Sequence, residues 1–322
     1  MLLELKKYSP IRKIKCLNAL LCARAFFQIG TLLMMLACSE QLAEEIELSD
    51  DPGVEDDTPE QAETTNNNPT IDFSNWKVTL PIPRPDGKPL EIEPPEILDY
   101  STNPVLTPFM FNDATDSSVV FYTYPGSTTT NSSYSRTELR EQMVPGSNNT
   151  NWTFAQGGKL RGTLAVPEVS TDENGNPHRI IIMQIHGRLT SAQRDIIGED
   201  DNNAPPVLKI YWYNKRVYVR TKELKNLNVS EEEMLRTTAW RDDDGRFFTR
   251  EVDTEKFTLE VTASEGRMTV TLDDEETFVY QNIHMEKWGI FENYFKAGNY
   301  LITTDEGAFS TVKYYELDIS HE

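Results

Sequence analysis

The segment "SYSRTELREQM", residues 133–143, carries two arginines and a glutamate at alternate positions. Side chains alternate between the two faces of a β-strand, so Arg136, Glu138 and Arg140 would share one face. The planar fork of an arginine forms two parallel hydrogen bonds with a carboxylate. The row therefore predicts either a solvated, salt-bridged surface or the floor of a site that binds anions, and the segment alone favours the surface.

A second segment, "IIIMQIHGR" at residues 180–188, changes from apolar to polar along its length. Its first four residues are typical of a buried central strand. Gln184, His186 and Arg188 then follow on one face, and His186 is the only one of the four histidines in the middle of a predicted strand. An imidazole has an unperturbed pKa of about 6.5 and can act as a base when neutral. A core histidine satisfied by a neighbour explains the segment alone equally well.

A third segment, "NYFKAGNYL" at residues 293–301, places Tyr294, Lys296 and Tyr300 on one strand face. They would supply one cation and two phenols. Gly298 lies between them and would let a ligand approach the backbone closely. An ordinary half-buried strand with aromatic residues is the alternative interpretation.

Together, the three segments resemble alginate lyases of polysaccharide lyase family 7. That family carries the motifs R-[ST]-E-L-R, Q-[IV]-H and Y-F-K-x-G-x-Y in this order, and "RTELR", "QIH" and "YFKAGNY" match them. "NWKVTLPIP" at residues 75–83 is similar to the opening strand of the family, and the resemblance spans residues 72–320. It implies a β-jelly roll that cleaves alginate. Ile302 stands where the family usually has a glutamine that contacts the sugar.

The resemblance also implies a reaction. Alginate is a 1,4-linked uronate polymer, and a lyase removes the proton at C5 and expels O4, which leaves a 4,5-unsaturated uronate end. Arg136, Gln184 and His186 would hold the substrate carboxylate, because the C5 proton becomes acidic only when that charge is neutralised. In guluronate the proton and the leaving group lie on opposite faces, so we expect His186 as the base and Tyr300 as the acid. In mannuronate they share a face, and Tyr300 could serve as both.

Substrate binding is expected from further polar residues of the same segments: Arg140, Glu138, Lys296, Arg188 and Tyr294. Ile185, in Q-I-H, favours guluronate-containing blocks by the same resemblance. An arginine and an amide can neutralise the carboxylate, so the reaction needs no metal and no cofactor.

Strand patterns dominate residues 70–322 and have to position these groups. Alternating segments are separated by turns such as "ENGNP" at 173–177 and "ASEG" at 263–266. They predict an all-β fold, an antiparallel β-jelly-roll sandwich with a concave substrate groove. One helix is predicted at residues 230–240, with Ser230 as N-cap and Glu233 completing a capping box. Residues 188–206 predict a long loop, and a loop that closes one end of the groove would make the enzyme exolytic.

The N-terminal segments predict export. Residues 1–38 begin with basic residues and continue with an apolar run that ends at Cys38, too short for a membrane span. "MLAC" resembles a bacterial lipobox, which would lipidate Cys38, while a plain cleaved signal or a membrane anchor is the alternative. All three cysteines lie in this segment, so the later residues hold no disulfide. Residues 39–69 predict an acidic disordered linker, and residues 70–322 the catalytic domain.

The net charge of −21 argues against nucleic acid and anionic membrane surfaces as partners. We expect alginate or oligo-alginate as the substrate, a monomer, and membrane contact only through a lipid at Cys38. The protein would then be a cell-surface or outer-membrane lipoprotein, or secreted.

Two other functions compete with the lyase. "EVDTEKF" would place Glu251, Asp253 and Glu255 on one strand face, like the E-x-D-x-E cluster of sandwich glycosidases that resemble family 16. Two such carboxylates about 5 Å apart could hydrolyse a neutral glucan. We expect this cluster at the surface, outside the groove, because carboxylates repel a uronate. A non-catalytic carbohydrate-binding sandwich is the second alternative, but it gives no reason for His186 and Tyr300 to accompany the arginines.

Overall fold

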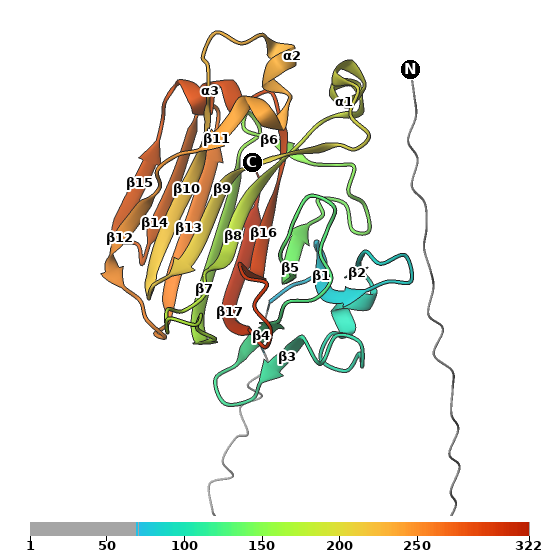
Figure 1. The fold of residues 1–322 in the computed structure, drawn as a ribbon, viewed down its shortest axis with the longest axis vertical. Helices are drawn as coiled ribbons and strands as arrows, with labels where there is room; N and C mark the ends of the chain where they lie inside the picture. The colour runs from blue at the N-terminus through green and yellow to red at the C-terminus, as the bar shows by residue number, and fades with distance from the viewer. Residues whose placement is uncertain (1–68, 70, 322) are drawn as a thin grey trace, which may run out of the picture. The chain divides into compact units, whose positions relative to one another are not determined.

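The computed structural model describes residues 69 and 71–321. Two antiparallel β-sheets pack against each other in this part of the chain (Figure 1), which confirms the predicted all-β sandwich of jelly-roll type. The predicted signal segment with Cys38, and the predicted linker up to residue 68, lie outside the described residues.

The larger sheet has ten strands and carries all three polar segments. Two short strands pair outside its main order, β12 with β10 and β6 with β16. In spatial order the main strands are β11 (Trp240–Asp242), β10 (Arg216–Leu224), β9 (Asn203–Tyr213), β8 (Ile180–Arg188), β16 (Glu292–Leu301), β5 (Arg136–Glu141), β1 (Trp76–Pro83) and β2 (Pro89–Ile92), with β12 at Arg246–Glu251 and β6 at Trp152–Thr153.

The smaller sheet has seven strands and covers one face of the larger sheet. Its order is β15 (Glu276–Tyr280), β14 (Arg267–Leu272), β13 (Phe257–Ser264), β7 (Gly158–Val169), β17 (Ser310–Ser320), β4 (Ser118–Thr123) and β3 (Met110–Asp113). The helices α1 (Ser191–Ile197), α2 (Glu231–Met234) and α3 (Ile283–Trp288) lie together at one end of the sheets (Figure 1). Two 3₁₀ turns, η1 and η2, span Glu96–Asp99 and Thr237–Ala239.

The apolar residues of the larger sheet point into the space between the sheets and form the core. On β5, Leu139 is fully buried in this core, together with Ile185 of β8 and Phe295 of β16. Tyr314 of β17 crosses from the smaller sheet and donates a hydrogen bond to the carbonyl oxygen of Ile182 at 2.5 Å. Because strand side chains alternate, the neighbouring polar residues must point to the opposite side, which we call the outer face of the larger sheet.

The helices differ from the sequence prediction in extent and number. The helix expected at residues 230–240 is confined to α2 and η2, and Ser230 caps α2 by accepting a hydrogen bond from the backbone of Glu233 at 3.2 Å. The long loop expected at residues 188–206 contains α1, which Thr190 and Gln193 fix through a reciprocal capping box. The short α3 was not predicted, because it has only 6 residues and lies close to strand sequence on either side.

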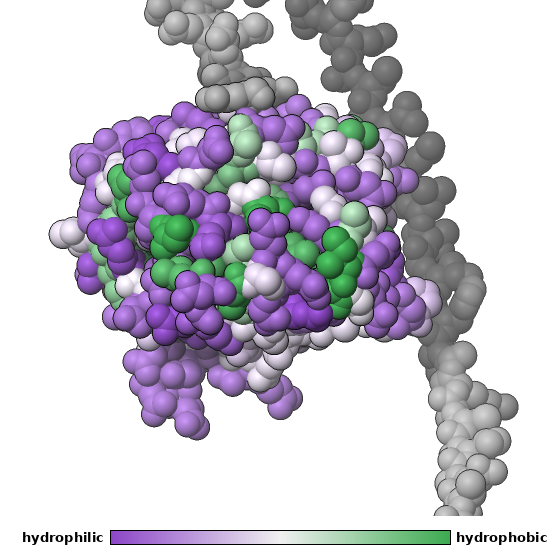
Figure 2. All heavy atoms as spheres, turned by 90° about the horizontal axis from the view of Figure 1, so that it is seen from above, coloured by the Kyte–Doolittle hydropathy of each residue, from purple (hydrophilic) through white to green (hydrophobic). Residues whose placement is uncertain are grey.

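The described surface is mainly polar where Figure 2 shows it. The view onto the end that carries the helices shows hydrophilic residues over most of the surface, with small, separated hydrophobic patches. None of the described helices is both long enough and apolar enough to cross a membrane.

Candidate active site

The three polar segments are neighbours in the larger sheet, because β16 pairs with β8 on one side and β5 on the other (Figure 1). Lys296 stands opposite both Arg140 and Gln184 in register, and Tyr300 stands opposite Arg136. Tyr294 stands opposite His186. The register thus brings the polar residues of three distant segments onto one stretch of the outer face.

Glu138 holds this cluster together. Its carboxylate accepts hydrogen bonds from Gln184 Nε2 at 2.5 Å and from an Arg136 guanidinium nitrogen at 3.1 Å. The ammonium group of Lys296 also donates to it. The residue is 1% exposed. Glu138 therefore positions the donors around it, while its expected contact with substrate stays a prediction.

Charge and burial set the protonation of the cluster. The pKa of Lys296 is lowered to about 8, chiefly by burial; Glu138 opposes this shift and the charge of Arg136 adds to it. The ammonium form is therefore retained mainly through its bond to Glu138.

The surroundings of His186 favour its neutral form. Burial, followed by the positive charges of Lys296 and Arg136, lowers its pKa to about 3. Its Nδ1 lies 2.9 Å from the carbonyl oxygen of Gly187. A carbonyl oxygen can only accept, so Nδ1 carries the proton and donates, and Nε2 keeps the free lone pair. The ring stacks on Tyr294 with centroids 5.2 Å apart, which fixes its orientation.

Tyr300 is positioned by a cation and a hydroxyl. The guanidinium carbon of Arg136 lies 3.7 Å from the centre of the Tyr300 ring. The phenol group of Tyr300 and the hydroxyl group of Ser132 form a hydrogen bond. Ser132 belongs to the loop between β4 and β5, so this loop reaches onto the outer face.

Arg140 is a buried cation that forms no ion pair with any residue of the described part of the chain. Its guanidinium donates to the carbonyl oxygens of Glu141 at 2.7 Å and Asn148 at 3.2 Å, and to Asn151 Oδ1 at 2.9 Å. It also lies 4.1 Å from the centre of the Tyr294 ring. A buried charge without a carboxylate partner is costly, so the site is suited to an anion.

Other expected residues lie at the margins of the site. Arg188 is partly exposed and donates to Asn149 at 3.3 Å. Ile185 is fully buried in the core and so can affect the site only through Gln184 and His186. Ile302 packs beside Tyr300 and lines a cavity of about 370 Å³ with Arg179 and other residues.

Gly298 has a different role from the one expected. A Cβ at this position would lie 2.7 Å from the carbonyl oxygen of Thr137 on β5, and φ is +131°. The glycine therefore permits close approach of the neighbouring strand at a bulge in β16, instead of close approach of a ligand.

Sequence reasoning missed several residues of the outer face. Lys77 of β1 stands opposite Arg140, and Lys209 of β9 stands opposite Gln184. Both belong to segments that had been predicted as strands, and their alternation with buried residues was the available signal. Ser132 lies in a loop and carried no such signal.

The carboxylates of the glycosidase alternative do not form a strand face. β12 ends at Glu251, and Asp253 and Glu255 follow in a turn. Asp253 pairs with Lys215 at 3.1 Å and Glu255 with Arg250 at 3.3 Å. The predicted shared face is therefore wrong, and two of the three carboxylates pair with cations instead. Nowhere in residues 71–321 is a group of three or more His, Cys, Asp or Glu side chains placed to hold a metal ion.

Comparison with known proteins identifies the family of the chain. The family model described as alginate lyase matches residues 71–321. The crystal structure of alginate lyase A1-II′, a member of polysaccharide lyase family 7, is 25% identical with a TM-score of 0.61, over 78% of this chain and 96% of that chain. A variant of A1-II′ in complex with substrate (GGMG) is 23% identical with a TM-score of 0.61, over 79% and 95%.

An alginate lyase from Pseudomonas aeruginosa is 22% identical, with a TM-score of 0.57 over 78% of this chain and 100% of that chain. Likeness at this identity supports the fold alone. None of the curated protein sequences matches the chain. The family model, however, spans nearly the whole described chain, so the protein belongs to the alginate lyases of polysaccharide lyase family 7.

Proposed function

We propose that this polysaccharide lyase cleaves alginate by β-elimination with His186 as the base and Tyr300 as the acid. The observation that carries the proposal is the hydrogen bond from Nδ1–H of His186 to the carbonyl oxygen of Gly187, which leaves the lone pair of Nε2 available to accept a proton. A base must be unprotonated at working pH, and this environment keeps it so. Tyr300 comes from the neighbouring strand β16 and carries its own hydroxyl partner.

The reaction follows from the contacts around Glu138. Arg136 and Gln184 each have donor hydrogens beyond the one given to Glu138, and these can bind the carboxylate of the sugar that loses its proton. As C5 is deprotonated by His186, negative charge builds on that carboxylate, and the preorganised donors stabilise it. Tyr300 gives its proton to O4 as the glycosidic bond breaks. Arg140 and Lys296 add positive charge to the same strands.

Release of unsaturated product from alginate tests the proposal, since the new conjugated double bond absorbs ultraviolet light. His186→Asn and Tyr300→Phe should each abolish this absorbance while leaving the folded structure intact by circular dichroism. Reducing sugar released without ultraviolet absorbance would instead mean hydrolysis and would reject the lyase mechanism.

The preferred substrate is proposed to contain guluronate. Its proton and leaving group lie on opposite faces, which suits a base and an acid from two different strands, β8 and β16. The substrate in the complex of A1-II′ is GGMG. Initial rates on polyguluronate and polymannuronate blocks test this preference, and a higher kcat/KM on polymannuronate contradicts it.

The cleavage mode is proposed to be exolytic. Asn131, next to Ser132, donates a hydrogen bond to Asp201 at 3.4 Å. The loop before β5 therefore meets the loop between α1 and β9, and such a contact favours entry of a chain end over binding along an open groove. The viscosity of alginate should fall slowly relative to the ultraviolet signal. A rapid early drop in viscosity would indicate internal cleavage.

We further propose that the chain is exported as a monomeric catalytic domain tethered through a lipid at Cys38. The support is the sequence of residues 1–69 alone. Metabolic labelling with palmitate, with Cys38→Ser as the control, tests the lipid. Loss of labelling in this variant is expected, and no labelling of the parent would contradict the anchor.

A further inference from the structure

A row of polar side chains crosses the larger sheet at right angles to its strands. The strand register aligns each member with the next, and every member lies on the outer face. From β1 to β10 the row is Lys77, Arg140, Lys296, Gln184, Lys209 and Arg220. Neighbouring strands lie about 4.8 Å apart, so the row offers a donor at each strand to a polymer that bears a carboxylate on each sugar.

The β9–β10 end of this row holds three cations around one carboxylate. Lys209, Lys222 and Arg220 all face the one carboxylate of Asp242, at 3.3, 2.5 and 3.8 Å. Burial lowers the pKa of Lys209, and Lys222 and Arg220 lower it further, against the opposite effect of Asp242.

Two neighbouring carboxylates contact other groups. Asp243 accepts hydrogen bonds from the backbone and hydroxyl group of Thr221, and Glu223 pairs with Arg241 at 3.1 Å. Three cations therefore share one carboxylate within a chain whose net charge is −21. Three cations around one carboxylate retain donor hydrogens that a further anion could accept.

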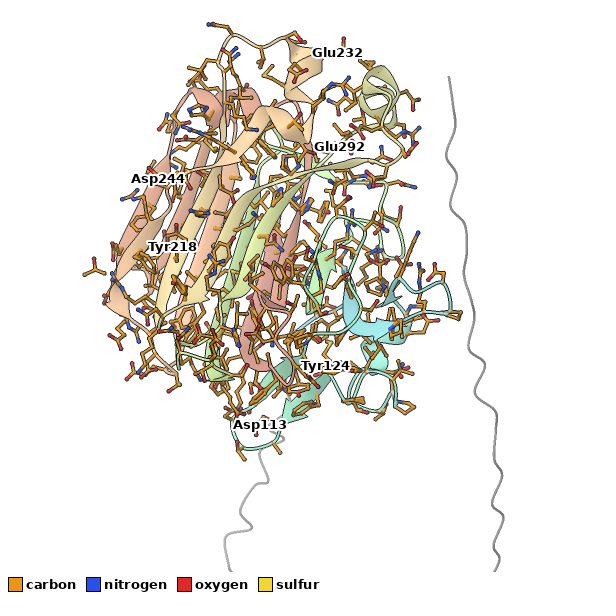
Figure 3. All side chains as sticks on the ribbon, viewed as in Figure 1. Asp113, Tyr124, Tyr218, Glu232, Asp244 and Glu292 are labelled. Atoms are coloured by element: carbon orange, nitrogen blue, oxygen red, sulfur yellow. The ribbon has the colours of Figure 1, made fainter. Side chains whose placement is uncertain are left out.

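The cluster is accessible and adjoins an aromatic surface. The side chains of Lys209 and Arg220 are 20% and 33% exposed. Tyr211 and Tyr218 lie next to them on the same strands and pack with Tyr300. Tyr218, which Figure 3 labels beside Asp244, donates a hydrogen bond to the Asp244 carbonyl oxygen at 2.7 Å. The tyrosines thus link the cluster to the catalytic residues.

We propose that Lys209, Arg220 and Lys222 form a remote anion subsite, which binds the carboxylate of a uronate one or two sugars away from the cleaved linkage. This inference rests on the proposed lyase function. Gln184 lies on β8, Lys209 one strand further and Arg220 two strands further, so only a chain that extends across β9 and β10 reaches the subsite. Asp242 holds the three cations together and partly neutralises them until a carboxylate arrives.

Substrate length tests the subsite. The double variant Lys209→Met/Arg220→Met should raise KM about tenfold for long guluronate oligosaccharides, with kcat retained, because charge-assisted hydrogen bonds are lost. The shortest oligosaccharide that is cleaved should show no change. Lys215→Met removes the same charge in the exposed β9–β10 turn, off the row, and should leave KM unchanged.

A second variant, with the opposite expected effect on KM, keeps the test valid if the double variant misfolds. Asp242→Asn removes the negative charge of the cluster and should lower KM for long oligosaccharides severalfold, with a steeper dependence on salt. If KM for long and short substrates changes equally, or only thermal stability changes, the cluster is structural and the proposal is wrong.

Calorimetric titration with guluronate oligosaccharides separates the two proposals. Binding by a parent protein that forms no unsaturated product would reject the lyase function while still measuring the subsite. Cleavage with normal KM in both cluster variants would reject only the subsite.

Discussion

Glu138→Gln is the change that probes the site most directly. Glu138 is 1% exposed and accepts from Arg136, Gln184 and Lys296. An amide in its place offers one acceptor oxygen and an NH₂ group that faces donors. Removing one partner from a buried ion pair costs about 3–5 kcal/mol of stability. Misplacing the donors that stabilise the developing charge should lower kcat by about 10²–10³-fold.

Glu141→Gln provides the matched control, because it lies on the same strand and is equally buried but faces the core. Its carboxylate accepts from Trp152 Nε1 at 3.0 Å and from the backbone of Phe295 at 2.8 Å. We expect urea unfolding to show lower stability for both variants. Steady-state kinetics below each melting temperature should show a lower kcat for Glu138→Gln alone. A Glu138→Gln variant that is less stable but has the parent kcat would refute the positioning role.

Three further predictions concern protonation and positioning. Because the pKa of His186 is lowered to about 3, the pH profile of kcat/KM should lack the limb near pH 6.5 that an unperturbed histidine gives; such a limb would contradict a buried neutral base. Ser132→Ala removes the partner of the Tyr300 phenol and should lower kcat up to about tenfold with little change in KM, whereas a change in KM alone would place Ser132 in binding. Burial lowers the pKa of His321, but the hydrogen bond to Glu141 outweighs burial, and the net shift is upward. The His321–Glu141 pair therefore stabilises the fold below about pH 6.5 and loses this effect as the pH rises through the folded-state pKa. His321→Gln should reduce the free energy of unfolding more at about pH 6 than at about pH 9.

The segments whose structure departs from the prediction share a physical cause. Glu251, Asp253 and Glu255 alternate as in a strand, but Asp253 adopts φ of +44° and the chain turns there. Local alternation does not specify whether a strand continues, since polar turns can alternate too. In residues 188–206 the capping box of Thr190 and Gln193 was present in the sequence, yet the helix it begins is too short for a hydrophobic period.

The sequence alone determined which residues share a face. Alternation has a period of two and is local, so Arg136 with Glu138, or Gln184 with His186, could be assigned without coordinates. The pattern from which export is predicted and the family motifs are likewise local.

Only the tertiary structure decided which faces meet. Lys296 and Glu138 are 158 residues apart in the chain, and their contact follows from how β16 pairs with β5. That register depends on the packed core and on the loops between the strands, which no short segment encodes. The buried position of Glu138 and the alignment of Lys209 with Gln184 could therefore be assigned only from the tertiary structure.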